Sequence, residues 1–453
     1  MGAISSPTLL NSVNSRSPSS SSPSFIFTHN LTSQTHPCLR LPRPHYNSSR
    51  LRCRNSSARM SSDYSATPLS ENPIVVGCGA VSVDFLATVA AYPKPDDKIR
   101  TTNFKVQGGG NAGNALTCVA RLGLKPRLIS KVSDDAQGRG ILDELDSDGV
   151  DTSYFAVSKE GTSPFTYIVI DNQTKTRTCI HTPGHPPMMP EDLPESSFLS
   201  ALNGARIVYF DGRLHETALV IAQKAVQKNI PILIDAERLR EGLDDLLKFS
   251  DYVVCSAKFP QAWTEAPTIP RALVSMLLRL PKIKFVIVTL GKDGCIMLER
   301  NVSEGHPTEE VDVDGLLESS EMRKNENITT PTCISSSVKK LKAEGIGTVC
   351  GRLYVGTAEN IPQSELIDTT GAGDAFIGAV LYGSCQVQSF GSTKWSSIPR
   401  RHTPGILLAL ELVRGGAEKF TLKNWAGGQV QGEAPLVISF GVLFYLQLGT
   451  IYQ

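Results

Sequence analysis

The sequence predicts an α/β fold, in which a mostly parallel sheet is flanked by helices and carries a small β-lid. Short apolar runs alternate with stretches whose apolar residues repeat at helical spacing, such as 215–228 and 271–280. Strands that alternate with helices in this way are typical of a parallel sheet covered on both faces. The predicted strands lie at 74–76, 127–132, 207–210, 230–234, 252–255 and 285–290.

Two other stretches, 98–106 and 165–181, alternate apolar with polar residues. Asp171, Asn172, Gln173 and Thr174 interrupt the second stretch as a turn. Half-exposed antiparallel strands show this alternation. We expect them to form the β-lid; the alternative is a pair of edge hairpins without a function.

The chain of 453 residues has room for one large α/β domain with extensions. We expect this domain to span 73–385. Residues 299–349 are polar and acidic, and a loop of that length is usually functional or disordered. They are therefore predicted to form a mobile insertion without chemistry.

The N-terminal stretch 1–62 contains no acidic residue and is rich in Ser and Arg. This composition is typical of an organelle transit peptide, which stays disordered. Dense Ser, without an amphipathic Arg-rich helix, favours the chloroplast over the mitochondrion. An ordinary disordered extension is the alternative, and a start at Met60 would give a cytoplasmic form.

The overall composition favours neither nucleic acid nor membrane as a partner. The net charge is +1, so no electrostatic attraction to polyanions is expected. No apolar run reaches the roughly 18 residues that span a bilayer. The ten cysteines form no C-x-x-C pair, which indicates reduced thiols and makes a zinc site unexpected.

The strongest chemical signal is Asp-Thr-Thr-Gly-Ala-Gly-Asp-Ala-Phe at 368–376, followed by a helical pattern to about Tyr382. Amide groups at the start of a helix attract anions, so Gly371, Ala372 and Gly373 suit the charge of a transferring phosphate. Asp374 in the same turn could accept a proton from an attacking hydroxyl. A glycine-rich turn before a helix with an N-terminal acid is the alternative reading.

A second motif, Gly-Gly-Asn-Ala-Gly-Asn at 109–114, precedes another predicted helix. Asn111 and Asn114 are three residues apart, so both amides could reach one face and bind sugar hydroxyls. Helix capping would explain one of the two. Asp84, an acid within an apolar run, is a further hydroxyl-binding candidate, or a turn residue.

The two motifs and their order resemble the ribokinase or pfkB family of carbohydrate kinases. Further segments are similar to its ketohexokinase-like members, and together with the N-terminal stretch 1–62 the resemblance suggests a plant plastid member of the family. The resemblance covers about 73–383, and these further segments are 83–84, 92–94, 98–100, 176–178, 211–213 and 237–241.

The resemblance implies that the protein uses ATP and Mg²⁺, often with K⁺, to phosphorylate a small-molecule sugar, and that it pairs through its lid into a homodimer. The sugar would be held by Asp84, Gly110, Asn111 and Asn114. The phosphate would lie on Gly371 to Gly373, and Asp374 would activate the hydroxyl. Nucleotide contacts would come from Thr289, Gly291, Gly294 and Arg177.

The sequence departs from the family pattern in two places. The usual Asn-x-x-Glu is missing near 252–261, so the metal ligands stay unknown. The stretch 386–453 has no counterpart to the helices that close the adenine pocket in the family, and we treat it as an atypical tail. A catalytically weak or inactive scaffold in a plastid complex and a nucleoside kinase therefore stay open as alternatives.

Overall fold

The computed structural model describes residues 72–174, 176–301, 309–324, 331–358 and 371–389. All of them fall within one compact unit, Thr67–Gln453. The predicted transit peptide at 1–62 and the tail beyond 389 lie outside the described residues.

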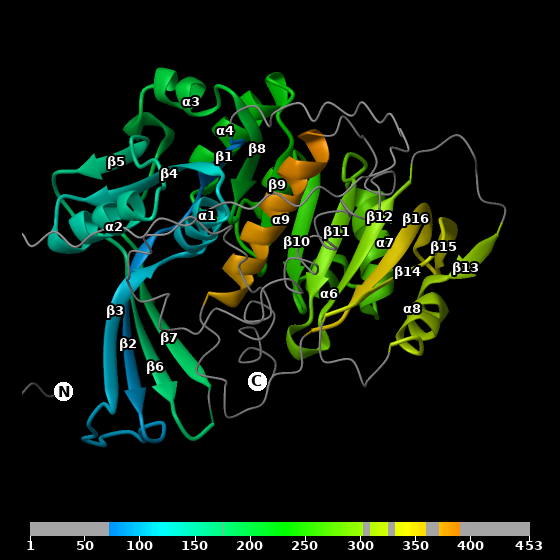
Figure 1. The fold of residues 1–453 in the computed structure, drawn as a ribbon, viewed down its shortest axis with the longest axis horizontal. Helices are drawn as coiled ribbons and strands as arrows, with labels where there is room; N and C mark the ends of the chain where they lie inside the picture. Colours follow the sequence, from blue (N-terminus) through cyan, green and yellow to red (C-terminus); the bar gives the residue numbers. More distant parts are fainter. Residues whose placement is uncertain (1–71, 175, 302–308, 325–330, 359–370, 390–453) are drawn as a thin grey trace, which may run out of the picture. The chain divides into compact units, whose positions relative to one another are not determined.

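The described part of the unit is built on a sheet of 12 strands (Figure 1). Its centre is parallel, as predicted, and towards one end the pairing becomes antiparallel, apart from a parallel strand at the very edge. The parallel strands are β1 (Ile74–Cys78), β4 (Lys125–Ser133), β5 (Phe155–Ser158), β8 (Ala205–Phe210), β9 (Ile232–Ala236), β10 (Tyr252–Ser256) and β11 (Phe285–Thr289). The others are β12 (Cys295–Arg300), β13 (Glu310–Asp312), β14 (Cys333–Ser335), β15 (Lys339–Ala343) and β16 (Gly347–Gly356).

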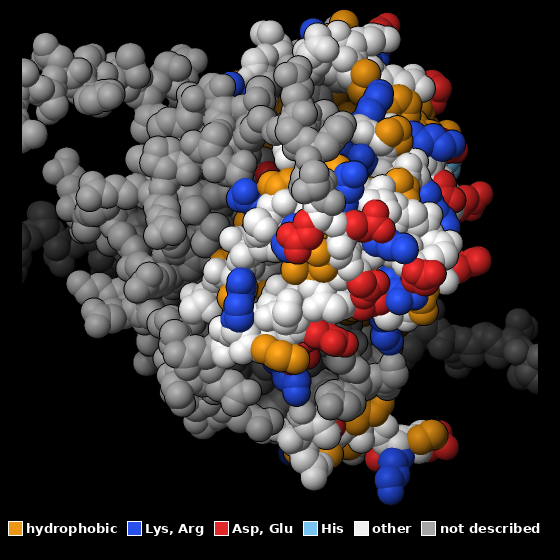
Figure 2. All heavy atoms as spheres, turned by 90° about the vertical axis from the view of Figure 1, so that its right-hand side faces the viewer, with side chains coloured by type: hydrophobic (Ala, Val, Ile, Leu, Met, Phe, Trp, Pro, Cys, Tyr) orange, Lys and Arg blue, Asp and Glu red, His pale blue; other side chains and the backbone are white. Residues whose placement is uncertain are grey.

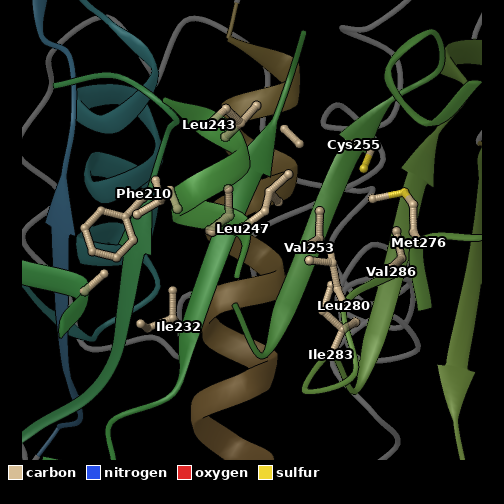
Figure 3. Packing of buried hydrophobic residues seen from close by; sticks show 14 of the residues in the cluster. Phe210, Ile232, Leu243, Leu247, Val253, Cys255, Met276, Leu280, Ile283 and Val286 are labelled. Carbon is tan, nitrogen blue, oxygen red and sulfur yellow. The ribbon is translucent and has the colours of Figure 1, made fainter. Parts of the chain in front are cut away.

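Helices pack on both faces of this sheet because successive strand residues point to opposite sides. Val253 and Cys255 belong to one buried cluster, and Val254 between them belongs to the other. Figure 3 shows Met276 and Leu280 lying beside Val253 and Val286 in the first cluster. Its helices are α3 (Glu195–Ala201), α4 (His215–Gln227), α5 (Leu243–Leu247), α6 (Phe259–Thr264), α7 (Ile269–Arg279) and α8 (Val313–Glu321). The opposite face carries α1 (Asn111–Arg121), α2 (Ala136–Ser147) and α9 (Ala372–Ser389).

A separate sheet of four strands forms the predicted lid and projects away from the main sheet (Figure 1). Its strands are β2 (Ser82–Val89), β3 (Asn103–Gly109), β6 (Phe165–Asp171) and β7 (Arg177–Thr182). The Asp171 carboxylate accepts hydrogen bonds from the backbone amides of Gln173 and Thr174, which confirms the predicted turn. Two details differ from the prediction: β3 begins at Asn103 rather than 98, and β2 also belongs to the lid.

The segment 299–349 is not one long mobile insertion. Where it is described, it forms β13, α8, β14 and β15 and begins β16, while 302–308 and 325–330 lie outside the described residues. Val313 and Leu316 are buried, so α8 has a genuine apolar face despite the polar composition. Figure 2 shows acidic and basic side chains intermingled on the face at this end, where Lys339 pairs with Glu309.

Among the described residues, no helix combines the length and apolar character needed to cross a membrane. Two short 3-10 helices complete the elements, Pro190–Asp192 and Gly291–Asp293.

Candidate active site

Asp374 lies in the first turn of α9, where the sequence predicted it. Gly371 precedes the helix with a φ of 79°, a conformation that glycine adopts without strain. The Asn114 side-chain amide donates a hydrogen bond of 2.8 Å to Asp374 Oδ2. Helix geometry leaves the first backbone amides of α9 without intrahelical acceptors, so they can bind an anion. The carboxylate and the expected anion hole, Gly371 to Gly373, thus occupy one turn.

Close packing of α1 against α9 holds Asn114 and Asp374 next to each other. A Cβ atom built on Gly378 would lie 2.7 Å from Cys118 Sγ, so glycine permits the two helices to approach. The Cys118 thiol also contacts the carbonyl oxygen of Ala375 at 3.6 Å. Asn114 and Asp374, 260 positions apart in the sequence, therefore meet because two helices pack side by side.

The environment of Asp374 raises its pKa from 3.8 to about 7, mainly because burial disfavours the charged carboxylate. The negative charges of Glu237 and Asp211 raise this pKa further, whereas the Asn114 hydrogen bond and the Arg177 charge lower it. A carboxylate with a pKa near the working pH suits general-base catalysis.

Asp84 lies inside β2, so it is not a turn residue. Its side chain is buried and accepts a hydrogen bond of 2.8 Å from the Ser82 hydroxyl. Thr166 provides a second hydrogen bond, while burial raises the pKa of the Asp84 carboxyl. A Cβ atom on Gly109 would lie 2.3 Å from this carboxyl group, so the lid strand needs glycine at that position.

The N-cap residue of α1 is Gly110, which has no side chain that could cap the helix. The side-chain amides of Asn111 and Asn114 therefore do not serve as the N-cap. Gly110 has a φ of 86°, and a Cβ atom there would lie 2.5 Å from Val81 Cα. The Asn111 Oδ1 atom accepts a hydrogen bond of 3.2 Å from Arg213 Nη2. Both asparagine side chains are thus turned towards charged groups of the site.

Sequence reasoning assigned no role to two acids: Asp211, which follows β8, and Asp235, which is the penultimate residue of β9. Asp211 is buried and accepts hydrogen bonds from the backbone amides of Ala80 (2.7 Å) and Arg213 (3.0 Å). Burial raises the pKa of both carboxyl groups, most strongly for Asp235. In the sequence, each of these acids stands at the end of a buried apolar run, and this was the signal that could have identified them. Because the strands are parallel, the ends of such runs lie at the same edge of the sheet.

The lid contributes charge through β7. The positive charge of Arg177 lowers the pKa of both Asp84 and Asp374. The His181 ring shares a hydrogen bond of 3.1 Å with the Thr166 hydroxyl. Burial and the nearby charge of Arg213 lower the pKa of His181.

The expected nucleotide loop follows β11. Gly291 and Gly294 have φ values of 62° and 88°, which form the tight turn into β12. The Thr289 hydroxyl is buried and donates to the carbonyl oxygen of Cys255 at 3.2 Å. Parallel pairing puts this loop at the same edge of the sheet as Asp235.

A cavity of about 390 Å³ borders the site, lined by Ser82, Gln107, Gly109 and Asn114 among others. A larger cavity of about 490 Å³ lies elsewhere, between α6, α7 and the β15–β16 turn. Among the described residues, no group of three or more His, Cys, Asp or Glu side chains could hold a metal ion.

Comparison with known proteins agrees with this architecture. Mouse ribokinase is 22% identical over 250 residues, covering 53% of this chain and 76% of the relative. Mouse ketohexokinase is 21% identical over 233 residues, covering 49% of this chain and 76% of the relative. A solved structure from Agrobacterium tumefaciens, described as a ribokinase, shares the fold with a TM-score of 0.51 and 23% identity, covering 73% of this chain and 88% of that one.

The family model described as "pfkB family carbohydrate kinase" matches residues 74–314, which is more than half of the chain. This match includes the lid, the glycine-asparagine motif and the strands that carry Asp211 and Asp235. The chain therefore belongs to the pfkB family of carbohydrate kinases.

Proposed function

We propose that the protein transfers the γ-phosphate of ATP to a hydroxyl of a sugar or related polyol, with Asp374 as the general base. The observation that carries this proposal is the hydrogen bond between Asn114 and Asp374 at the start of α9, in surroundings that raise the pKa of Asp374 to about 7. Ribokinases and a ketohexokinase are among the relatives, and another relative, from Halopiger xanaduensis, is named as an ATP-dependent ribose-1-phosphate kinase.

The chemistry follows from this geometry. The ionised Asp374 takes the proton from the substrate hydroxyl while the hydroxyl oxygen attacks the γ-phosphorus. The new P–O bond forms as the bond to the leaving ADP breaks. The amides of Gly371 to Gly373 stabilise the negative charge that develops on the phosphoryl oxygens. Asp84, Asn111 and Asn114 hold the other hydroxyls. Mg²⁺ bound with ATP would supply further positive charge to neutralise the phosphates.

The test is an assay of the purified protein for ADP release with ATP and D-ribose, D-fructose or adenosine as acceptor. The adenosine arm separates a sugar kinase from a nucleoside kinase. We expect Asp374→Ala to lower kcat by about 10³-fold while leaving sugar affinity, measured by calorimetry, largely intact. Asp134→Ala is the matched control, because that acid is exposed and pairs with the exposed Arg139.

Turnover of Asp374→Ala equal to the wild type would rule out the assigned base. Failure of a folded wild-type protein to phosphorylate any acceptor would support the inactive-scaffold alternative instead.

We further propose that residues 1–62 direct the protein to the chloroplast. Their Ser- and Arg-rich composition without acids supports this proposal. A fluorescent fusion of the full chain in plant cells should accumulate in plastids, and a fusion that starts at Met60 should stay in the cytoplasm. Cytoplasmic fluorescence from both would contradict it.

A further inference from the structure

We propose that Arg213 is a positioning residue that fixes the orientation of the Asn111 amide. This orientation in turn determines how Asn111 binds the substrate hydroxyls. This inference rests on the proposed function, in which Asn111 contacts the sugar. Arg213 has no assigned part in that chemistry, and it lies 102 positions from Asn111 in the sequence.

On one side, Arg213 supplies a donor. Its Nη2 atom donates to Asn111 Oδ1 at 3.2 Å and to Glu237 Oε2 at 3.3 Å, which uses both of its N–H groups. Its Nε atom is buried without a hydrogen-bond partner and lies 3.9 Å from Asp211 Oδ2. Asp211 therefore attracts the guanidinium by charge without competing for Nη2.

On the other side, Asp235 supplies an acceptor. Asn111 makes a side-chain hydrogen bond to this carboxyl group that lowers the pKa of Asp235, although burial raises that pKa overall. The Asn111 side chain therefore has the Arg213 guanidinium as a donor at its oxygen and the Asp235 carboxyl group as a partner at its nitrogen.

These two neighbours determine which way the amide faces. A flipped amide would put N–H groups against the guanidinium, so that contact would become repulsive, and the N–H bond to Asp235 would be lost. With the amide held, Asn111 still has one oxygen lone pair and one N–H group unused. A sugar hydroxyl both donates and accepts, so it can pair with both of them at once.

Backbone and side-chain contacts hold Arg213 itself in place. Gly212 has a φ of 70°, which turns the chain sharply after β8. Asp211 accepts a hydrogen bond of 3.0 Å from the Arg213 backbone amide. Glu237 also accepts from Arg240 Nη2 at 2.8 Å, so the acid that contacts Arg213 is anchored on both sides. The guanidinium has little freedom to leave Asn111.

The test compares Arg213→Gln, Arg213→Lys, Asn111→Ala and the double variant, using the acceptor sugar with the highest ADP release among D-ribose and D-fructose. We expect Arg213→Gln to raise the KM for sugar about tenfold, with the KM for ATP and the melting temperature unchanged, because an amide cannot replace a charged donor. Arg213→Lys should recover part of the loss. Arg238→Gln is the matched control, since Arg238 is 63% exposed and contacts Glu237 only at 3.6 Å.

The double-mutant cycle tests whether Arg213 affects sugar binding by way of Asn111. If Arg213 acts through Asn111, adding Arg213→Gln to Asn111→Ala should change the KM for sugar by less than about twofold. Crystal structures should show the Asn111 amide rotated in Arg213→Gln and unmoved in Arg238→Gln, whatever the activity.

The possible failures are distinguishable. Additive losses in the double variant, or an unmoved Asn111 amide in Arg213→Gln, would overturn the positioning role alone. An unchanged KM for sugar in Asn111→Ala would contradict the sugar-binding part of the proposed function.

Discussion

At the scale of single residues, the Asn114 hydrogen bond adjusts the proton affinity of Asp374. As the proposed general base, Asp374 would act in its ionised form, so kcat/KM should fall as the pH drops through about 7, where this carboxylate becomes protonated. Asn114 lowers that pKa because its N–H stabilises the ionised carboxylate. Removing Asn114 should therefore raise the pKa.

We predict that Asn114→Ala moves the acid limb of the kcat/KM profile to higher pH, besides weakening sugar binding. The measurement is kcat/KM for the sugar between pH 5 and 9 at about constant ionic strength, so that screening does not change. A variant with lower kcat/KM but an unmoved acid limb would show that Asn114 serves binding alone.

From the sequence alone we could predict the candidate site residues that belong to short continuous motifs. Gly371, Asp374, Asn111 and Asn114 stand in short motifs, and the structure places them in the first turns of two packed helices. Asp211, Asp235 and Arg213 received no role, because their importance arises from strand pairing. Their positions become evident only when β8 and β9 lie side by side, with α1 above them.

At the scale of elements, the base of the lid depends on a glycine in β3. Gly109 has an ordinary φ, so only space limits this position. We predict that Gly109→Ala costs about 1–3 kcal/mol of stability, or shifts Asp84 and raises the KM for sugar, because the new methyl group would meet the Asp84 carboxyl. The measurements are urea unfolding and sugar kinetics.

A matched control for Gly109 is available in α2. Gly140 is exposed, and a Cβ atom there would have no neighbour within 4 Å. Gly140→Ala should raise stability by about 0.5–1 kcal/mol, since alanine favours helix. A loss of sugar affinity in Gly140→Ala as large as that in Gly109→Ala would contradict the steric explanation.

The polar composition of its segment prevented the prediction of α8. The acidic residues around it suggested a loop, but Asp314 accepts hydrogen bonds from Thr268 Oγ1 (2.7 Å) and Arg271 Nε (2.5 Å) at the start of α7. Such long-range pairs cannot be recognised from local polarity. Likewise β2 was missed as a lid strand, because a buried acid interrupts its apolar residues.

We predict that Asp314→Ala lowers the free energy of unfolding by about 1–2 kcal/mol without changing kcat, because it removes charged hydrogen bonds far from Asp374. Lys248→Ala, which removes a pair whose side chains are 68% and 62% exposed, should cost less than about 0.5 kcal/mol. Equal unfolding midpoints for Asp314→Ala and the wild type would mean that this segment adds nothing to the fold.

At the scale of the whole molecule, the two faces of the lid have different roles. Asp84, Thr166 and His181 are paired neighbours on one face, which carries the site. At the neighbouring position of each strand, Phe85, Tyr167 and Ile180 lie side by side on the other face. Because strand residues alternate, the fold that builds the site also builds an apolar outer surface.

This outer surface suits the homodimer through the lid that the family resemblance implies, and we propose that the protein forms it. Val106, Tyr167 and Ile180 are 51%, 51% and 56% exposed, more than isolated surface residues require. We predict that Ile180→Glu converts dimer into monomer in analytical ultracentrifugation, because a charge would be buried without a partner. Met322→Glu is the control, since Met322 is 82% exposed at the end of α8 and should leave the dimer intact. A wild-type protein that sediments as a monomer would contradict the proposal, as would a dimer that persists in Ile180→Glu.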